Sequence, residues 1–149
     1  MKNPKNSKID SKLRPFHLAI PSSNLIKLSN WYVKTLNCEI GRTSKDWIDL
    51  NFYGHQLVLH YDDKIMHMNS MNTVDKRKVP THHFGIVLEN NQWEDLKDRL
   101  LRENINFIIK PHIRFKGKKG EQKTMFFLDP EDNALEFKSF KNDSMIFQK

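Results

Sequence analysis

The 149-residue sequence contains a single cysteine, five glycines and no apolar run long enough to cross a membrane. The one thiol, Cys38, excludes an internal disulfide framework and is typical of proteins from a reducing compartment. No stretch approaches the roughly 18 consecutive apolar residues of a membrane-spanning helix. The opening residues, MKNPKNSKIDSK, lack the apolar segment of a signal peptide. These absences predict a cytoplasmic protein with no membrane partner.

Apolar and aromatic residues are present in the amounts that a folded protein needs. Hydrophobic residues make up 38% of the chain, which is enough for one domain or for two small halves that share a core. The net charge is +7, to which residues 1–14 contribute +4 and residues 110–123 contribute +5, while the rest of the chain carries −2. Because this charge lies in a tail and one loop, and not along a groove-binding helix, we expect no nucleic-acid partner.

The chain repeats one order of elements twice: a strand, a helix and three strands. The first copy covers residues 14–60 and begins with the alternating strand RPFHLAIP. Ser22 or Ser23 is expected to cap the following helix, which should end near Asn37. The three further strands of this copy are expected at residues 38–43, 45–52 and 55–60.

The second copy covers residues 81–140 and begins with the strand THHFGIVL. Asn91 and Glu94 then resemble a capping box at the start of a second helix. Between the copies, residues 61–80 are polar and lack periodicity, so we interpret them as a linker or a lid. Further strands are expected at residues 106–110, 124–128 and 134–140, with a polar basic tail at 1–13 and a second tail at 141–149.

The first strands of the two copies match residue for residue. His17-Leu18-Ala19-Ile20 corresponds to His83-Phe84-Gly85-Ile86. Strand alternation places each histidine on the same face as the small residue two positions later, which leaves space beside the imidazole. The neighbouring His82 is a rival to His83, but alternation places it on the opposite face.

The last strand of the second copy contains an unusual carboxylate. Ala134, Glu136 and Lys138 are expected on one face, and Leu135, Phe137 and Ser139 on the other. Buried acidic residues are rare unless they are paired or bind a metal. The alternative is that Glu136 faces solvent on an ordinary amphipathic strand.

The motifs FHLAIP, GHQLVLH, HHFGIVLE and FFLDPEDNALEF resemble the vicinal-oxygen-chelate superfamily, which includes glyoxalases, bleomycin-resistance proteins and extradiol dioxygenases. The resemblance covers about residues 14–140 and is greatest to a bacterial group described as predicted ring-cleaving dioxygenases. It implies an α+β fold in which tandem βαβββ modules form a curled mixed sheet around a metal cavity, with the helices on the outside.

The resemblance implies that His17, His83 and Glu136 bind a divalent metal. Two imidazoles and one carboxylate suit Fe(II) first, with Mn(II), Zn or Ni as alternatives. The implied activity is a dioxygenase acting on a small aromatic or vicinal-oxygen substrate. A binding protein without turnover, as in the bleomycin-resistance branch, and a glyoxalase-like isomerase or lyase stay open, and so does the question whether the chain is an enzyme.

A fourth ligand would separate these activities, because glyoxalase-type isomerases use one and ring-cleaving dioxygenases do not. A gapless overlay of the two copies places Val58 opposite Glu136, and valine cannot bind a metal. The site is then open and has three protein ligands. If the overlay slips by two residues, Gln56 or His60 becomes a fourth ligand.

Other residues are implied around the substrate. The superfamily's dioxygenases carry an acid–base histidine near His60, although a strand-end histidine facing water is the alternative. Gln56 and Val58 are expected to point inward with it. Those enzymes have a tyrosine near the position that Phe126 occupies here. Phenylalanine has no hydroxyl group, so Phe126 cannot form the hydrogen bonds of a tyrosine.

Two residues of the hairpin that flanks Glu136 are further candidates for substrate binding. Arg114 and Gln122 could reach the mouth of the cavity, where an arginine would suit a substrate carboxylate. The alternative for Arg114 is a solvated loop charge. The expected partners are a small-molecule substrate and, from the resemblance, a second copy of the chain in a homodimer.

Overall fold

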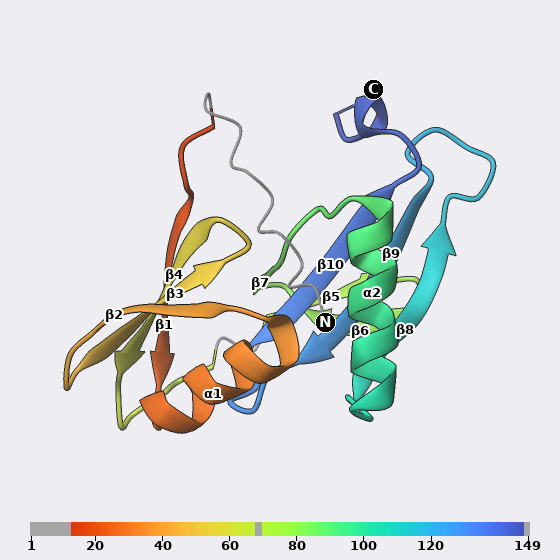
Figure 1. The fold of residues 1–149 in the computed structure, drawn as a ribbon. Coiled ribbons are helices and arrows are strands. Elements are labelled where there is room, and N and C mark those ends of the chain that lie inside the picture. The colour runs from red at the N-terminus through yellow and green to blue at the C-terminus, as the bar shows by residue number, and fades with distance from the viewer. Residues whose placement is uncertain (1–12, 68–69, 148–149) are drawn as a thin grey trace. The chain divides into compact units, whose positions relative to one another are not determined.

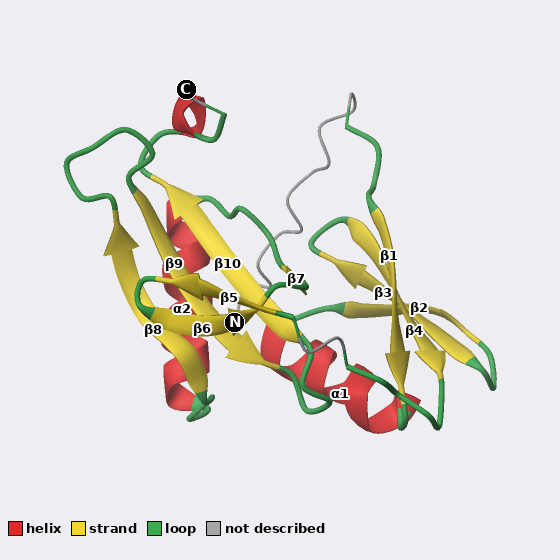
Figure 2. Cartoon of the chain, turned by 180° about the vertical axis from the view of Figure 1, so that it is seen from behind, coloured by secondary structure: helices red, strands yellow, loops and turns green. Residues whose placement is uncertain are grey.

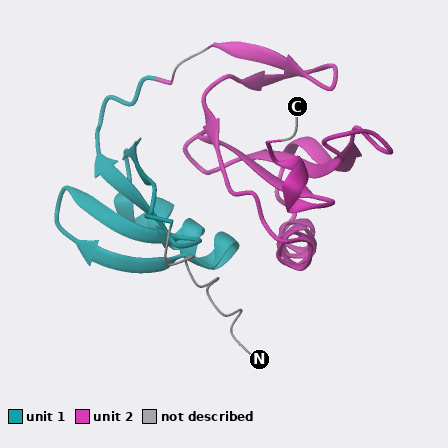
Figure 3. Ribbon diagram, turned by 90° about the horizontal axis from the view of Figure 1, so that it is seen from above, with its two compact units in different colours: residues 1–66 teal, residues 67–149 magenta. Residues whose placement is uncertain are grey.

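The computed structural model describes residues 13–67 and 70–147 (Figure 1). The basic tail expected at residues 1–13 lies outside the described residues except for Leu13. The chain divides into two compact units, one ending at Met66 and the other beginning at His67 (Figure 3). Within the described ranges, no helix has the length and hydropathy needed to span a membrane.

The first unit is one βαβββ module with a four-stranded mixed sheet. The strand order is β1-β4-β3-β2, with β1 parallel to β4 and the other pairs antiparallel. Its elements are β1 (His17–Ser22), α1 (Leu25–Leu36), β2 (Glu39–Thr43), β3 (Trp47–Phe52) and β4 (His55–Tyr61).

Helix α1 is capped by Asn24, and not by Ser22 or Ser23 as predicted. The Asn24 side chain accepts a hydrogen bond from the backbone N–H of Lys27 at 3.0 Å. Ser22 instead accepts from the backbone N–H of Asn24 at 3.2 Å, and so supports the cap residue from two positions earlier. The helix ends as predicted at Asn37, whose φ of 55° is left-handed.

Apolar residues of α1 cover one face of the first sheet. Leu28, Tyr32 and Leu36 are buried, and the ring centroid of Tyr32 lies 6.3 Å from that of Phe52 on β3. Burial of these side chains provides the main stabilisation of the unit. Along each strand, the side chains that alternate with those packed against α1 lie on the other face of the sheet, which α1 does not cover.

The second unit repeats this topology with a sheet of order β7-β10-β9-β8, in which β7 is parallel to β10. The predicted α+β fold with tandem βαβββ modules is therefore confirmed. The elements of the second unit are β5 (Met71–Val74), β6 (Arg77–Pro80), β7 (His83–Phe84), α2 (Asn90–Arg102), β8 (Phe107–Arg114), β9 (Gln122–Leu128), β10 (Ala134–Phe140) and the 3₁₀ turn η1 (Asp143–Met145).

The predicted capping box of Asn91 and Glu94 is wrong, because helix α2 begins at Asn90, one residue earlier than the predicted N-cap. Glu89 is the N-cap, and its backbone N–H donates to Oε1 of Gln92 at 3.1 Å. Glu94 instead forms ion pairs with Lys97 and Lys123. Because both lysines bind the Glu94 carboxylate, this side chain does not cap the backbone at the start of the helix.

Residues 61–80, the predicted linker or lid, contain a hairpin, β5–β6. Its turn residues, Asp75 and Lys76, both have positive φ, 49° and 65°, as in a type I′ turn. Such turns usually contain Asn-Gly or Asp-Gly, and neither dipeptide occurs at this turn, so no hairpin is predicted here from the sequence. In Figures 1 and 2 the hairpin lies on the face of the second sheet opposite α2. Val79 is fully buried there with Ile109 and Phe126.

Strand β7 is shorter than the strand predicted over residues 81–88. A Cβ atom at Gly85 would lie 1.7 Å from the carbonyl oxygen of Glu136, so the backbones of β7 and β10 approach too closely for any side chain. Ladder bonding resumes just beyond, where the N–H of Lys138 donates to the Ile86 carbonyl at 3.1 Å. Glycine at 85 is therefore required by backbone packing, besides any space it leaves for the imidazole.

Candidate metal centre

The second unit brings His83 and Glu136 together on the sheet face opposite α2. In the parallel β7–β10 pair, His83 is level with Ala134, and Glu136 follows two residues later on the same face. Nε2 of His83 lies 3.4 Å from Oε2 of Glu136. The Glu136 side chain is only 7% exposed, so the carboxylate does not face solvent as the alternative interpretation required.

The atoms that face away from this contact, Nδ1 of His83 and Oε1 of Glu136, are held by further hydrogen bonds. Nδ1 of His83 lies 2.9 Å from the carbonyl oxygen of Pro80, and a carbonyl can only accept, so Nδ1 carries the hydrogen. In the neutral form of the ring, Nε2 would then present its lone pair toward Glu136. The hydroxyl of Thr124 donates to Oε1 of Glu136 at 2.7 Å. Outer contacts of this kind orient metal-binding histidines and carboxylates.

Lys138 is a site residue that sequence reasoning left without a role. Its Nζ lies 3.3 Å from Oε2 of Glu136, the same oxygen that faces His83. It supplies a positive charge to a carboxylate that would be costly to bury alone. The available signal was its position two residues after Glu136, which places both side chains on one face of β10.

The first unit holds His17 by a chain of side chains. Nδ1 of His17 lies 2.7 Å from Oε1 of Gln56, its neighbour in the parallel β1–β4 register. Nε2 of Gln56 donates to Oδ2 of the buried Asp49 at 3.3 Å. Arg42 forms an ion pair with the same oxygen. Sequence reasoning missed Asp49 and Arg42, although alternation in WIDLNF opposes Asp49 to Ile48 and Leu50.

The two registers confirm the gapless overlay of the modules. His17 pairs with Gln56 as His83 pairs with Ala134, so two residues later Val58 corresponds to Glu136. Val58 is 4% exposed and apolar. His60 lies four residues beyond Gln56 on β4, about 13 Å along the strand at the usual rise per residue.

The remaining predicted residues lie on the second sheet. Phe126 is level with Glu136 and 1% exposed, and its ring centroid is 4.8 Å from that of His83. Arg114 is bound to the β5–β6 hairpin, with its Nε 2.9 Å from Oδ2 of Asp75. Gln122 is level with Arg114, and its buried Oε1 has no hydrogen-bond partner among the described residues.

The chain has a solved relative with substantial sequence identity. A glyoxalase/bleomycin resistance protein/dioxygenase from Alicyclobacillus acidocaldarius is 33% identical, and the match covers 99% of this chain and 100% of that one with a TM-score of 0.75. This chain belongs to the glyoxalase/bleomycin resistance protein/dioxygenase family. The predicted membership of the vicinal-oxygen-chelate superfamily is thereby confirmed.

More distant structures share the family's fold. The fosfomycin resistance protein FosX from Listeria monocytogenes is 11% identical over 89% of this chain and 97% of its own, with a TM-score of 0.65. A lactoylglutathione lyase from Agrobacterium tumefaciens is 12% identical over 88% and 96%, with a TM-score of 0.59. No protein-family model and no curated protein matches the chain.

The donor chemistry of the three predicted ligands suits a divalent first-row metal in this family's fold. His17 and His83 each have Nδ1 in a hydrogen bond, which leaves Nε2 available, and Glu136 contributes a carboxylate. No cluster of three or more His, Cys, Asp or Glu side chains that could hold a metal occurs in residues 13–67 and 70–147. Burial raises the pKa of Cys38 to about 12, which disfavours the thiolate that a metal needs.

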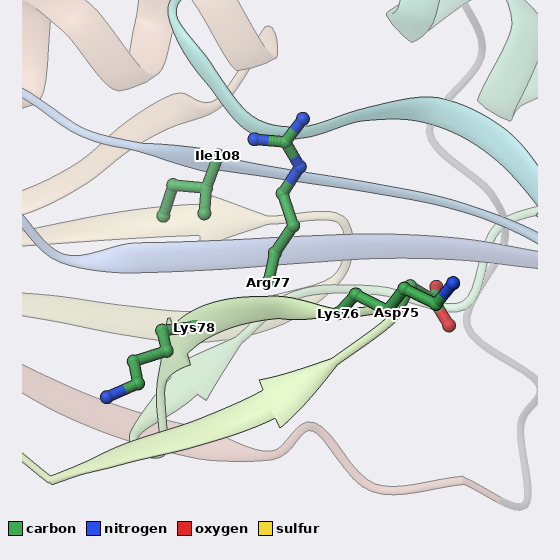
Figure 4. A pocket seen from close by; sticks show the side chains of 5 residues that line it. All are labelled: Asp75, Lys76, Arg77, Lys78 and Ile108. Carbon is green, nitrogen blue, oxygen red and sulfur yellow. The ribbon is translucent and has the colours of Figure 1, made fainter.

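A separate hollow lies beside the hairpin turn. It has a volume of about 490 Å³ and is lined by Asp75, Lys76, Arg77, Lys78 and Ile108 (Figure 4). The side chains of Arg77 and Lys78 point in different directions there. None of the predicted site residues lines this hollow, so it is distinct from the candidate metal centre.

Proposed function

We propose that this family member is a metal-dependent enzyme in which His17, His83 and Glu136 bind one divalent cation. The observation that carries the proposal is the facing pair in the second unit, where Nε2 of His83 is 3.4 Å from Oε2 of Glu136. Both outer atoms of this pair are already hydrogen bonded, so the two inner atoms are fixed toward a shared point. Fe(II) is the first choice of metal, followed by Mn(II), Zn and Ni.

The proposed reaction is dioxygenation of a small aromatic or vicinal-oxygen substrate. Val58 occupies the place that corresponds to Glu136, which supports three protein ligands and disfavours an isomerase or lyase that needs four. His17, His83 and Glu136 would hold the metal, and the chemistry that it would supply when bound is chelation of vicinal substrate oxygens and activation of dioxygen. The small-molecule substrate, the homodimer and the cytoplasmic location stay predictions.

The chain's own residues would orient the substrate and move its proton. The edge-on pair of Phe126 and His83 forms an apolar wall beside the carboxylate. Lys138 places a cation on the same face and would attract an ionised substrate oxygen. His60 is the proposed proton carrier, and its distance along β4 requires the substrate to extend toward it.

A second candidate function is binding of a small molecule without turnover. The contact between Lys138 and Glu136, 3.3 Å, favours it because the lysine already neutralises the carboxylate. In that case a metal is not needed to stabilise the buried charge. Metal content and oxygen consumption distinguish this candidate from the enzyme.

The proposal is tested by loading the protein with Fe(II) without oxygen and measuring bound metal. Oxygen uptake is then followed with a panel of catechols. The wild type should retain about one iron per chain. Loss of a residue that only supports a metal ligand typically lowers the metal affinity by about 10- to 100-fold, and His83→Ala, which removes a ligand itself, should lower it by at least that much. His112→Ala is the matched control, because this imidazole of the same unit binds Asp75 in the β5–β6 turn and has no contact with Glu136 that the structure records among the described residues.

Full iron retention by His83→Ala would contradict the proposed ligand set. Failure of the wild type to bind any divalent metal, together with tight binding of an aromatic compound, would instead establish the second candidate. Iron binding without oxygen uptake on any catechol would leave the ligand set in place and exclude this reaction class.

A further inference from the structure

We propose that Gln56 is a positioning residue that fixes the tautomer and direction of the His17 ring, and that Asp49 and Arg42 hold Gln56 in place. The inference rests on the proposed function in one respect, since the ring atom that Gln56 leaves available is the proposed metal ligand. Gln56 was expected to bind substrate or to be a fourth ligand. Its contacts in the first unit point to a different role.

The first step is the contact between the two side chains. Nδ1 of His17 lies 2.7 Å from Oε1 of Gln56, and the two residues are neighbours in the β1–β4 register. The amide oxygen can only accept, so Nδ1 must carry the ring hydrogen. Nε2 of the neutral ring then has a free lone pair, which is the form that binds a metal.

The second step fixes which way the Gln56 amide faces. Its Nε2 donates to Oδ2 of Asp49 at 3.3 Å, and a carboxylate can only accept. The amide must therefore turn its nitrogen toward Asp49 and its oxygen toward His17. The strand register supports this arrangement. Asn51 on β3 is level with Gln56 on β4, so Asp49 lies two residues along β3 from the position opposite Gln56. Asp49 itself is level with Val58, and Trp47 is level with His60.

The third step anchors the carboxylate. Nε and Nη2 of Arg42 lie 3.1 Å and 3.0 Å from Oδ2 of Asp49. The Arg42 guanidinium also lies over the ring of Trp47, 5.5 Å from its centroid. The Asp49 side chain is 10% exposed, so the charge of Arg42 compensates a nearly buried anion. The order of the chain is then Arg42, Asp49, Gln56 and His17.

The second unit reaches the same result without a side chain. Nδ1 of His83 uses the backbone carbonyl of Pro80, and the place of Gln56 is taken by Ala134. The orientation of His83 is therefore a property of the backbone. The orientation of His17 depends on the side-chain amide of Gln56, which a substitution can remove.

The experiment reads the tautomer directly. The ring nitrogens of the metal-free protein are observed by ¹⁵N NMR at about pH 8, where an ordinary imidazole is neutral. In the wild type, His17 should be protonated at Nδ1. His55 is the internal control, since its Nδ1 accepts from the backbone N–H of Phe16 at 3.0 Å and must therefore be unprotonated.

Two variants test the chain of contacts. Gln56→Leu should give His17 a mixture of tautomers and lower the affinity for Co(II), used as a spectroscopic probe, by about 10- to 100-fold. The double variant Gln56→Glu with Asp49→Asn keeps the net charge and keeps an oxygen acceptor facing Nδ1 of His17, while the donor of the bond between residues 49 and 56 moves to residue 49. It should restore the wild-type tautomer and most of the Co(II) affinity, while His55 stays unchanged in every variant.

The inference is wrong if His17 of the wild type is protonated at Nε2, or if Gln56→Leu leaves both the tautomer and the Co(II) affinity unchanged. These results differ from failure of the proposed function. A wild type that binds no Co(II) would contradict the metal centre, and the nitrogen shifts of the metal-free protein would still decide the role of Gln56.

Discussion

The two units have the same sheet order and the same register around their first and last strands, but they differ in which strand of the sheet carries a buried carboxylate. In the first unit Asp49 lies on β3, level with Val58. In the second unit Glu136 lies on β10, level with Phe126. The apolar and the acidic residue have exchanged strands between two otherwise equivalent positions. The scaffold is therefore repeated, while the chemistry placed on it is not.

The exchange changes what each carboxylate can do. Glu136 contacts the imidazole of His83 directly. Asp49 is separated from His17 by the amide of Gln56 and is neutralised by Arg42. Glu136 therefore contacts an imidazole directly, whereas Asp49 contacts one only through an amide. The β5–β6 hairpin adds a further difference, because it packs on the open face of the second sheet.

The largest effect is expected from making the second unit resemble the first at one position. Ala19 corresponds to Gly85, so Gly85→Ala copies the first unit into the second. The new Cβ would meet the Glu136 carbonyl at 1.7 Å, and we expect a loss of about 3 kcal/mol in unfolding free energy. Urea denaturation measures this change.

Gly41→Ala is the control for this substitution. Its Cβ would lie 3.4 Å from Cβ of Asp49, which is an ordinary contact, and we expect a change below about 0.5 kcal/mol. Equal stabilities of the two variants would show that β7 and β10 can separate at no cost.

Much of this comparison could be predicted from the sequence. The matching tetrapeptides around His17 and His83 and the alternation around Glu136 were sufficient for the repeat, the register and the place of Val58. Thr124 was not predictable, since it reaches Glu136 only through the pairing of β9 with β10. Lys138 lies on the face of β10 that alternation predicts, but alternation alone does not show its contact with Glu136. The hairpin was missed because Asp75-Lys76 adopts a turn that sequence rules reserve for glycine.

A smaller effect is expected from loosening the hairpin, which distinguishes the second unit. Val79 is fully buried against Ile109 and Phe126. Val79→Ala removes two methyl groups from this cluster, and we expect a loss of about 2 kcal/mol. Val87→Ala is the control, since Val87 is 45% exposed in the same unit. A hairpin that contributes nothing to stability would give the two variants the same unfolding midpoint.

The smallest effect concerns Glu94 on α2, which forms ion pairs with Lys97 of the same helix and with Lys123 on β9. The hydrogen bond from Lys123, followed by that from Lys97, lowers the pKa of Glu94. A lowered pKa in the folded state means that the stabilisation is present above the unfolded value, about 4.3, and is lost as the pH falls through the folded value. Glu94→Gln should therefore cost about 0.5 kcal/mol at neutral pH, after screening by solvent.

Urea denaturation of wild type and Glu94→Gln across about pH 7 to pH 2 checks this dependence. The difference between the two proteins should shrink as the pH is lowered. A difference that grows toward acid would mean that the carboxylate is not stabilised in its ionised form.

The most direct test of the central claim is a crystal structure of the metal-loaded protein with anomalous data at the absorption edge of the metal. The account predicts one peak within about 2.3 Å of Nε2 of His17, Nε2 of His83 and a carboxylate oxygen of Glu136, with Val58 making no contact to it. A peak bound by other residues, or an ion that leaves His17 uncoordinated, would contradict the claim that two copies of one scaffold contribute unequal parts of a single site.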